Sequence, residues 1–401
     1  MQIHIQFEML ERYSSPETIM SFVRKLLHLV GLDGTTIRDR LRFGSIFLFY
    51  IFFTVIPQLT GGYSDIHQLV QASVEFLFNC NIFVSSLLFA HKAATFRAFV
   101  RELKILAQFA CSMSYKIKRT LVRFNRQADI LAKLQTTCMT VIALCYWVAP
   151  LTSIYWFYLG SSNSTEPLQL VQHLEVKFYW LENRTILRDY VIFVLIMLPV
   201  VFMSSSMCNL KVMIVSCSIA HCTLFTRLTV KAIEELPDAT PYRRTSKSLS
   251  NVVLMHARLL KCIHLLNRTL RSMLLLQWLI CGLNWSISLV YLTNTGISLK
   301  SITVIVMFVL ATSETFLYCL LGSRLATQQE RLERAIYAKR WYNYPRKVQR
   351  NILTILRQTQ KATDITVGKF FRVNLEEFSR IANLSYSAYV VLKDQIQMDT
   401  N

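Results

Sequence analysis

Seven apolar segments, separated by gaps of alternating positive charge, constrain this chain of 401 residues more than any other feature. Each segment is about 17 to 25 residues long, which is enough for a helix to cross a hydrocarbon core of roughly 30 Å. A hydrophobic share of 53% agrees with a chain that lies largely in lipid. We therefore predict an all-α membrane protein with seven transmembrane helices. The segments are residues 43–59, 69–90, 135–159, 190–214, 272–293, 301–322 and 374–392.

Positive charge is distributed unevenly among the gaps between these segments. Lys and Arg are abundant in 91–134, 215–271 and 323–373, whereas 60–68 has neither and 294–300 has a single Lys. Basic loops stay in the cytoplasm when a helical membrane protein inserts, so these three gaps are predicted to be cytoplasmic. The N-terminus is then cytoplasmic and, after seven crossings, the C-terminus is extracellular. A G-protein-coupled receptor has the opposite orientation, and the charge pattern argues against that class.

The formal net charge of +20 would also suit a nucleic-acid-binding protein. Here the basic residues are spread over loops that flank apolar spans. We therefore attribute the charge to orientation in the membrane and to contact with anionic lipid headgroups. The expected partner is membrane lipid, and no nucleic acid is expected.

The predicted spans and gaps divide the chain into four regions. Residues 1–40 form a cytoplasmic N-terminal segment. Residues 41–322 hold the first six transmembrane helices with their cytoplasmic extensions. Residues 323–373, broken at Tyr344-Pro345, form a cytoplasmic anchor region. Residues 374–401 hold the last helix and a short extracellular tail.

Local signals predict helices outside the spans as well. An amphipathic helix is expected to begin near Ser15 and to end at Gly31 or Gly34. The gap 91–134 has neither Pro nor Gly and keeps a helical apolar rhythm, so it is predicted to continue helices two and three. Pro237 predicts a break within the next basic gap.

The pattern of reactive residues gives no sign of an enzyme. The sequence has no Gly-rich phosphate loop, no nucleophile elbow and no His and Cys at zinc-binding spacing, so no cofactor or metal is expected. None of the ten cysteines lies in a predicted extracellular loop, which predicts no structural disulfide. Two glycosylation sequons, at Asn163 and Asn183, fall in the gap 160–189 on the predicted extracellular side.

The C-terminal part carries a series of short motifs in a fixed order. They include Phe316-Leu317-Tyr318-Cys319, Leu321-Gly322-Ser323-Arg324-Leu325, Arg340-Trp341-Tyr342, Gly368-Lys369-Phe370-Phe371, Val373-Asn374-Leu375-Glu376-Glu377-Phe378 and Ser385-Tyr386-Ser387. This series, over roughly the last 80 residues, resembles the C-terminal signature of insect odorant receptors. The span count, the loop lengths and the inverted topology agree with that family along the rest of the chain.

The resemblance implies a ligand-gated, non-selective cation channel in the plasma membrane of olfactory sensory neuron dendrites. Family members assemble as tetramers in which a tuning receptor joins an obligatory co-receptor through cytoplasmic anchor helices. The implied partners are the odorant receptor co-receptor, a volatile odorant, and monovalent and divalent cations. This chain lacks the long insertion that the co-receptor carries between helices four and five. After Val390-Val391-Leu392 it also has Lys393-Asp394-Gln395, where the co-receptor stays mostly apolar with a Gln. The chain therefore resembles a tuning subunit.

The resemblance also assigns the last helix to the pore. Counting from Phe378 without gaps places Val391 at the family's apolar gate and Asp394 where the co-receptor has a Gln. A ring of valines narrows a pore and closes it by dewetting. Without the resemblance, the same segment is an ordinary last span whose charges mark its exit into water. The predicted pore and gate residues are Asn383, Ser387, Val391, Lys393 and Asp394.

In the same family the odorant pocket lies in the outer halves of helices two, three, four and six. A volatile ligand is small and mostly apolar, so its pocket needs apolar and aromatic side chains with one or two polar groups. Tyr146 and Ser153 are the expected hydrogen-bonding groups. The predicted ligand-binding residues are Ser73, Phe76, Cys80, Phe83, Tyr146, Pro150, Ser153, Phe157, Phe193, Met197, Met307, Phe308 and Ala311.

Two carboxylates lie inside the first six predicted spans, at Glu75 and Glu314. A charge in the bilayer costs several kcal/mol unless it is paired or faces water, so such residues are usually functional. Glu314 is expected to pair with a basic residue of a neighbouring helix. Glu75 lies near the outer end of its span, where it either snorkels to the interface or stays protonated.

Two alternatives from other classes remain open at this point. A gustatory-type receptor channel has the same topology but typically ends in a Thr-Tyr motif followed by Gln-Phe, whereas this chain has Ser385-Tyr386-Ser387. A membrane transporter would more often show inverted repeats and spans broken by Gly or Pro near the midplane. Apart from Pro150 and Pro199, these spans are unbroken.

Overall fold

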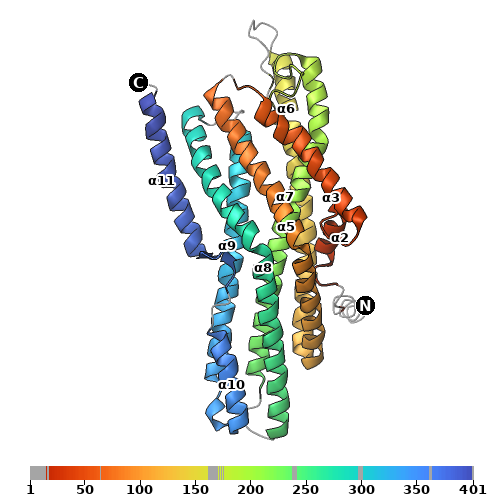
Figure 1. Ribbon diagram of the computed structural model, residues 1–401, viewed down its shortest axis with the longest axis vertical. Helices are drawn as coiled ribbons and strands as arrows, with labels where there is room; N and C mark the ends of the chain where they lie inside the picture. Colours follow the sequence, from red (N-terminus) through yellow and green to blue (C-terminus); the bar gives the residue numbers. More distant parts are fainter. Residues whose placement is uncertain are drawn as a thin grey trace.

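The computed structural model describes residues 15, 18–63, 65–160, 170, 172, 174, 176–236, 242–296, 301–360 and 364–399. In this part the chain forms an elongated bundle of long helices with one two-stranded hairpin (Figure 1). The helices are α2 (Ser21–Val30), α3 (Ile37–Tyr50), η2 (Ile51–Val55), α4 (Ile56–Thr60), α5 (Ile66–Met113), α6 (Tyr115–Gly160), α7 (Leu187–Glu234), α8 (Tyr242–Thr295), α9 (Ile302–Ala338), η4 (Trp341–Asn343), α10 (Arg346–Thr359) and α11 (Leu375–Asp399). The strands are β1 (Thr366–Val367) and β2 (Phe371–Arg372).

Six helical segments of the described residues are long and apolar enough to cross a membrane. They are Ile37–Thr60, His67–Met113, Tyr115–Thr152, Leu187–Glu234, Lys247–Thr295 and Ile302–Ala338. The seventh predicted span forms α11, which has 25 residues but is more charged than the others, with Glu376, Glu377, Arg380, Lys393 and Asp394 along it. The predicted all-α class is confirmed, and each predicted span is helical.

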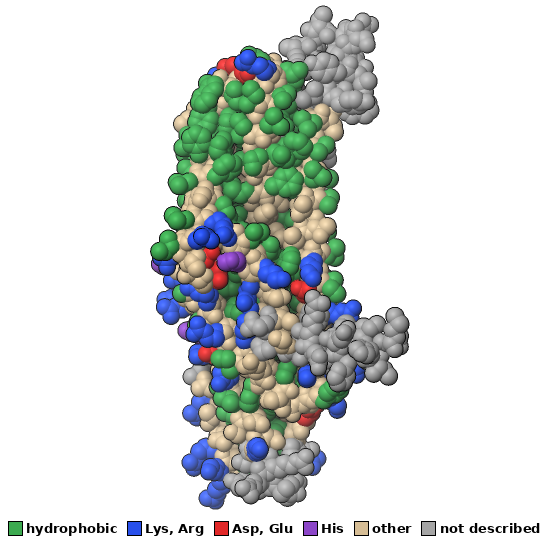
Figure 2. Space-filling model, turned by 90° about the vertical axis from the view of Figure 1, so that its right-hand side faces the viewer, with side chains coloured by type: hydrophobic (Ala, Val, Ile, Leu, Met, Phe, Trp, Pro, Cys, Tyr) green, Lys and Arg blue, Asp and Glu red, His purple; other side chains and the backbone are tan. Residues whose placement is uncertain are grey.

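The surface divides along the long axis into an apolar part and a basic part. Figure 2 shows hydrophobic side chains over the upper half of one face and Lys and Arg gathered on the lower half. Leu195 on α7 and Val309 on α9 are 60% and 56% exposed in this single chain. Large exposed apolar side chains in such a continuous zone are expected where helices face lipid.

The predicted helical extensions beyond the apolar spans are confirmed. α5 and α6 contain 48 and 46 residues and are separated only by Ser114. α7 also has 48 residues, or about 70 Å at 1.5 Å per residue, which is more than twice the thickness of a hydrocarbon core. The break predicted at Pro237 falls between the end of α7 and the start of α8. The bundle therefore continues well beyond one end of its apolar zone.

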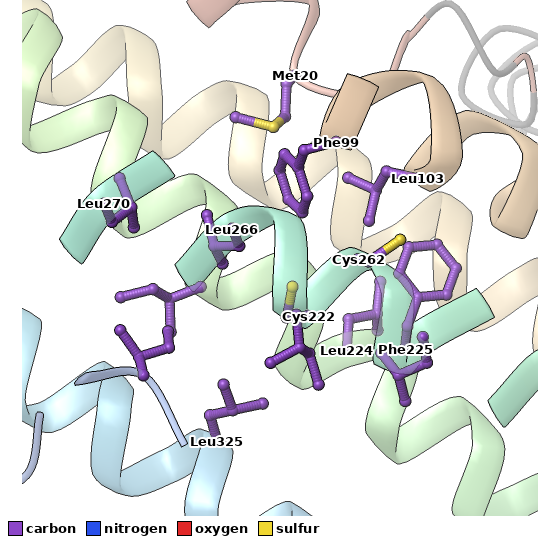
Figure 3. Packing of buried hydrophobic residues seen from close by; sticks show 14 of the residues in the cluster. Met20, Phe99, Leu103, Cys222, Leu224, Phe225, Cys262, Leu266, Leu270 and Leu325 are labelled. Atoms are coloured by element: carbon purple, nitrogen blue, oxygen red, sulfur yellow. The ribbon is translucent and has the colours of Figure 1, made fainter. Parts of the chain in front are cut away.

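The main hydrophobic core lies where α5, α7, α8 and α9 pack together. Figure 3 shows Phe99 and Leu103 from α5 facing Phe225 of α7 and Leu266 of α8. All four side chains are 0% exposed. Burying a Leu or Phe side chain completely contributes about 1.5–3 kcal/mol, so this cluster is a major source of stability for the extended part of the bundle.

The N-terminal helix is shorter than predicted. α2 begins at Ser21, six residues after the expected start at Ser15, and buries Val23 and Leu27 on one face. Its predicted end at Gly31 is confirmed, with a φ of 83°. A Cβ at Gly31 would collide with the carbonyl oxygen of Asp39, so both backbone conformation and space require glycine there.

The first span is not a uniform α-helix. Its middle, Ile51–Val55, is a π-helix that precedes Pro57 in the first turn of α4. Proline has no N–H to donate, and its ring crowds the carbonyl of the fourth residue before it. A wider π turn relieves that crowding, which explains its position immediately before the proline.

The hairpin β1–β2 positions the start of α11. Thr366 pairs with Arg372 and Val367 with Phe371 in an antiparallel register. The chain then crosses α9 at Gly322, and the amide N–H of Leu375 donates to the hydroxyl of Ser323 at 3.0 Å. In Figure 1, α11 stands at the edge of the bundle, while α10 lies near the far ends of α8 and α9.

Candidate ligand cavity and exposed terminal helix

A cavity lies between α5, α6, α7 and α9, within the apolar half of the bundle. The space between its lining side chains is about 670 Å³ when the open solvent at its mouth is included. Its lining is Phe78, Asn79, Ile82, Met139, Ile142, Ala143, Tyr146, Leu174, Val200, Val201, Ser204, Ser205, Cys208, Val306, Met307 and Leu310. The predicted combination of helices two, three, four and six is therefore the combination that encloses this cavity.

The lining is apolar with a few neutral polar groups, and no charged side chain occurs among its described residues. Ser205 donates to the carbonyl of Met139 at 3.1 Å, which satisfies its hydroxyl. The Nδ2 of Asn79 donates to the carbonyl of Glu75 at 3.0 Å. Because a backbone carbonyl only accepts, this bond fixes the orientation of the Asn79 amide. Within the described part of the chain, Oδ1 of Asn79 accepts no hydrogen bond.

Two of the predicted ligand-binding residues, Tyr146 and Met307, lie on the cavity wall. The hydroxyl of Tyr146 hydrogen-bonds with Thr303, and the Tyr146 ring packs beside Met307 in a small apolar cluster. Each of them lies one helical turn from another lining residue: Tyr146 from Ala143 on α6, and Met307 from Leu310 on α9.

The predicted residues of α5 lie on other faces of that helix. The hydroxyl of Ser73 donates to its own helix at the carbonyl of Leu69, and Phe76 does not line the cavity. Cys80 and Phe83 face Tyr50 of α3: the Tyr50 hydroxyl is 3.9 Å from the Cys80 sulfur, and the Tyr50 and Phe83 rings stack at 3.6 Å. The cavity uses Phe78, Asn79 and Ile82 instead.

Apart from Tyr146, the predicted residues of α6 lie nearer the C-terminal end of that helix than the cavity lining does, and those of α7 lie nearer its N-terminal end. Pro150 is buried one turn beyond Tyr146, while Ser153 and Phe157 lie in the last turns of α6, where side chains are outside the described residues. Phe193 and Met197 are fully buried in a second apolar cluster with Phe178. Val200, Ser204 and Cys208 continue the same face of α7 and line the cavity.

The other two predicted residues of α9 face a different neighbour. The ring of Phe308 lies 6.4 Å from that of Trp285, and Ala311 is buried against Cys281 and Trp285 of α8. They belong to the contact between α8, α9 and α11, not to the cavity wall. Sequence reasoning missed Ser204 and Ser205, although two adjacent serines inside an apolar span were a visible signal.

The loop before α7 covers the outer part of the bundle. The ring of Phe178 packs 5.5 Å from that of Phe193, and Leu174 belongs both to this cluster and to the cavity lining. The neighbouring Trp180 is 84% exposed, as expected of an interfacial aromatic residue. The loop therefore packs Phe178 and Leu174 against the bundle while Trp180 stays on its surface.

The two predicted glycosylation sites differ in position. Asn163 lies outside the described residues. Asn183 is 1% exposed; its Nδ2 donates to the carbonyl of Val176 at 3.1 Å, and its Oδ1 accepts from the amide of Phe178 at 3.4 Å. A glycan would have to be attached at that same buried nitrogen, so this geometry argues against the predicted glycan on Asn183.

One side of α11 packs on α8 and α9. The Phe378 ring lies 5.6 Å from Trp285 and 5.5 Å from Phe316, and Ser286 donates to the carbonyl of Ser385 at 3.0 Å. A Cβ at Gly282 would lie 3.5 Å from the Ser385 hydroxyl, an ordinary contact distance, which places Ser385 beside α8. Ser385 thus faces α8.

The opposite side of α11 is uncovered in the single chain. Val391 is 58% exposed, and Asn383, Ser387 and Asp394 are exposed as well, whereas Lys393 is half-buried. Asn383, Ser387, Val391 and Asp394 follow one another at helical spacings of four, four and three, so they share a face. The predicted pore residues other than Lys393 therefore form one stripe that points away from the rest of the subunit.

Both carboxylates predicted inside the spans are buried and bonded. The Oε1 of Glu314 lies 2.8 Å from the Nζ of Lys211 on α7, so the expected pairing with a neighbouring helix is confirmed. Glu75 is 0% exposed and accepts a hydrogen bond from Nε2 of Gln71 at 3.0 Å. The expectation that Glu75 snorkels to the interface is wrong, because its side chain stays inside the bundle.

Comparison with known proteins agrees with this architecture. The sequence pattern of the 7tm Odorant receptor family matches residues 65–386. Odorant receptor 2a of Drosophila melanogaster is 34% identical over 88 residues, which is 22% of each chain. Odorant receptor 33b of the same species is 26% identical over 176 residues, covering 44% of this chain and 46% of that one. The odorant receptor coreceptor of Aedes aegypti is 25% identical over 138 residues, covering 34% and 29%. These aligned stretches span less than half of each relative.

The fold is also that of a solved receptor. The insect olfactory receptor OR5 from Machilis hrabei superimposes with a TM-score of 0.64 at 14% identity, over 94% of this chain and 99% of that one. Its complex with eugenol superimposes with a TM-score of 0.65, over 96% of this chain and 100% of that one. The family pattern covers most of the chain, and the helices agree with a solved receptor over nearly its whole length. The chain therefore belongs to the 7tm odorant receptor family.

Proposed function

We propose that this chain is an odorant-binding tuning subunit of a heteromeric, ligand-gated, non-selective cation channel. The observation that carries the proposal is the apolar cavity enclosed by α5, α6, α7 and α9. An occupant of this cavity contacts four helices at once, so it changes the free-energy difference between helix arrangements according to how well it fits each one. The solved OR5 receptor, which has the same fold, was also determined in complex with the odorant eugenol.

The cavity wall favours a neutral ligand with a hydroxyl group. A charged ligand would lose its hydration without gaining an opposite charge, because no charged side chain occurs in the described lining. The acceptor Oδ1 of Asn79 suits a ligand that donates a hydrogen bond, and the hydroxyls of Tyr146 and Ser204 add neutral polar contacts. A small alcohol or phenol with an apolar body matches both features.

The proposed partner is the odorant receptor co-receptor, in a heterotetramer in the plasma membrane. Support comes from exposed aromatic side chains in the anchor region: Tyr337, Tyr342 and Phe370 are 70%, 62% and 77% exposed in the single chain. Aromatic residues of this kind are enriched at subunit contacts. The apolar face of α10, with Val348 and Ile352, is already buried within the chain, so it is not part of this surface.

The exposed stripe of α11 is the proposed pore wall, with Val391 as the gate. An apolar side chain at a constriction excludes water and ions, while polar groups above and below keep the pathway wet. Asn383 and Ser387 provide such groups on the same face, and Asp394 would attract monovalent and divalent cations toward the mouth. In a tetramer around a central axis, this face of α11 is the one left uncovered by α8 and α9.

The test is whole-cell current during application of an odorant panel, with this chain expressed alone and together with the co-receptor. A tuning subunit gives current only on co-expression, and Tyr146→Phe shifts its odorant tuning. Current from this chain alone would mean that it assembles into channels by itself. If both conditions are silent despite surface expression and a broad panel, the proposed function is wrong.

A further inference from the structure

We propose that the buried Lys211–Glu314 ion pair is a positioning pair that lies one helical turn below the cavity and couples its occupation to α11. The inference rests on the proposed function of the cavity and goes beyond it. It assigns a role to two charges that touch neither the proposed ligand site nor the proposed pore.

The pair lies one helical turn below the cavity on both helices that contribute it. On α7, Cys208 lines the cavity and Lys211 follows three residues later. On α9, Leu310 lines the cavity and Glu314 follows four residues later. The Nζ and Oε1 atoms are 2.8 Å apart, and both side chains are 4% exposed. Any displacement of α7 relative to α9 by a cavity occupant therefore acts directly on this contact.

A network of hydrogen bonds extends the pair to α5 and α8. The Nζ of Lys211 also donates to Oε1 of Gln277 at 2.9 Å and to Oδ1 of Asn81 at 3.3 Å. An ammonium group has three hydrogens, so these two bonds and the contact with Glu314 use all of them. Glu314 in turn accepts from the Tyr318 hydroxyl at 2.6 Å. The network is fully bonded at its centre and joins the same α5, α7 and α9 that enclose the cavity.

This arrangement specifies geometry more than it adds stability. Removing two charges from water is costly, and well-packed apolar residues often stabilise a buried site at least as well as an ion pair. The charge-assisted hydrogen bond within the pair, however, depends on a short distance and a favourable angle, so it weakens when α7 and α9 slide along each other. The pair therefore favours one alignment of α7 with α9 over neighbouring ones.

The network reaches α11 through a single stripe of α8. Gln277 donates through Nε2 to the Thr315 hydroxyl at 3.0 Å, and that hydroxyl lies 3.2 Å from the sulfur of Cys281. Cys281 and Trp285 belong to a buried cluster that packs against Phe378 on α11. Gln277, Cys281 and Trp285 are spaced by four residues and lie on one face of α8.

The ion pair below the cavity and the beginning of α11, the proposed pore helix, are therefore connected by an unbroken series of contacts. A contiguous set of packed and hydrogen-bonded side chains that has two discrete arrangements is what carries coupling between distant sites. The alignment of α7 with α9 at the ion pair supplies such an element. An occupant that favours a second alignment moves Gln277 and Trp285, and with them Phe378.

The experiment compares ligand binding with channel opening in the double variant Lys211→Met, Glu314→Met, co-expressed with the co-receptor. Binding is measured as ligand-induced thermal stabilisation of the purified complex, and opening as the ligand concentration for half-maximal current. The control is the double variant Lys133→Met, Asp129→Met, which removes a pair on α6 with the same 2.8 Å separation but a 59% exposed Lys. The probe is an alcohol that activates the unaltered channel.

We expect the Lys211 and Glu314 double variant to bind ligand like the unaltered receptor while its half-maximal current concentration changes by about tenfold, within the usual range of allosteric coupling. The control is expected to change neither quantity. The double variant is used because a single change leaves an uncompensated buried charge and is expected to lower surface expression. Equal behaviour of the two double variants in both measurements would overturn the inference.

If the double variant does not reach the cell surface, a second variant tests the inference. Tyr318→Phe removes one hydrogen bond to Glu314 and keeps the ring and both charges, so it is expected to change the ligand concentration for half-maximal current without affecting binding. An unchanged current response of Tyr318→Phe would then overturn the inference. Failure of the proposed function is a different result, because the unaltered receptor itself would then neither bind nor conduct.

Discussion

The carbonyl oxygen of Val373 lies against the α-carbon of Gly322, at a point where even a methyl group has no room. This contact is where the chain leaving the β1–β2 hairpin crosses α9, immediately before α11 begins. A Cβ at position 322 would also meet the side chain of Val373. The glycine therefore determines how closely the start of α11 approaches the bundle.

Gly322→Ala is expected to lower the stability of the receptor by about 1–3 kcal/mol, the usual cost of overpacking a tight site. The colliding atoms are backbone, so they have little freedom to move aside. The measurement is thermal unfolding of the purified complex in detergent. Gly44→Ala is the control, because nothing lies within 4 Å of a Cβ there and alanine favours a helix. Equal melting temperatures for the two variants would show that α11 adjusts without cost.

Asn79→Leu is expected to reduce the preference for an alcohol over its methyl ether by about tenfold, because a lost hydrogen bond to a buried acceptor is worth about that factor. The two ligands have similar shapes and differ in the hydrogen that Oδ1 of Asn79 would accept. The measurement is the ratio of half-maximal current concentrations for the matched pair. Ile82→Leu, on the same wall, serves as the control and is expected to leave the ratio unchanged. An equal loss of response to both ligands would contradict a hydrogen-bonding role for Asn79.

Asn183→Ala is expected to destabilise the loop before α7 by about 1–3 kcal/mol, because two buried backbone groups lose their partners. These groups are the carbonyl of Val176 and the amide of Phe178. Thr185→Ala removes the sequon but keeps Asn183, so it should change neither stability nor the gel mobility shift caused by glycan removal. A mobility change of one glycan in Thr185→Ala would show that Asn183 carries a sugar despite its burial.

Val391→Ser is expected to raise current in the absence of ligand, because a hydroxyl allows water into a constriction that an apolar ring keeps dry. The measurement is basal current per receptor at the surface, with the co-receptor present. Ser385→Ala is the control: Ser385 lies six residues before Val391 on the opposite face of α11, buried against α8, and its substitution is expected to leave basal current unchanged. If Val391→Ser is as silent as the control, the gate lies elsewhere on α11.

The sequence determined the class of fold and the helical character of the predicted spans. Whether a segment crosses a bilayer depends on the summed apolarity of about 20 consecutive residues, a quantity that needs no knowledge of neighbours. Local sequence also predicted the long helical extensions, because 91–134 contains no Pro or Gly. It predicted the break after α7 from Pro237. The motifs between Phe316 and Ser387 indicated the family that the comparisons then showed.

Tertiary structure alone decided which face of each helix meets which neighbour. On α5, the sequence proposed Cys80 while the cavity uses Ile82, and two residues are about 200° apart around a helix. Both faces are apolar, so hydropathy could not distinguish a side chain that faces Tyr50 from one that faces a cavity. Packing likewise decided the partner of Glu314, because Lys211 lies on another helix and far from Glu314 in the sequence. Rotation about a helix axis and pairing between distant helices are set by contacts among many side chains at once, and no single stretch of sequence contains that information.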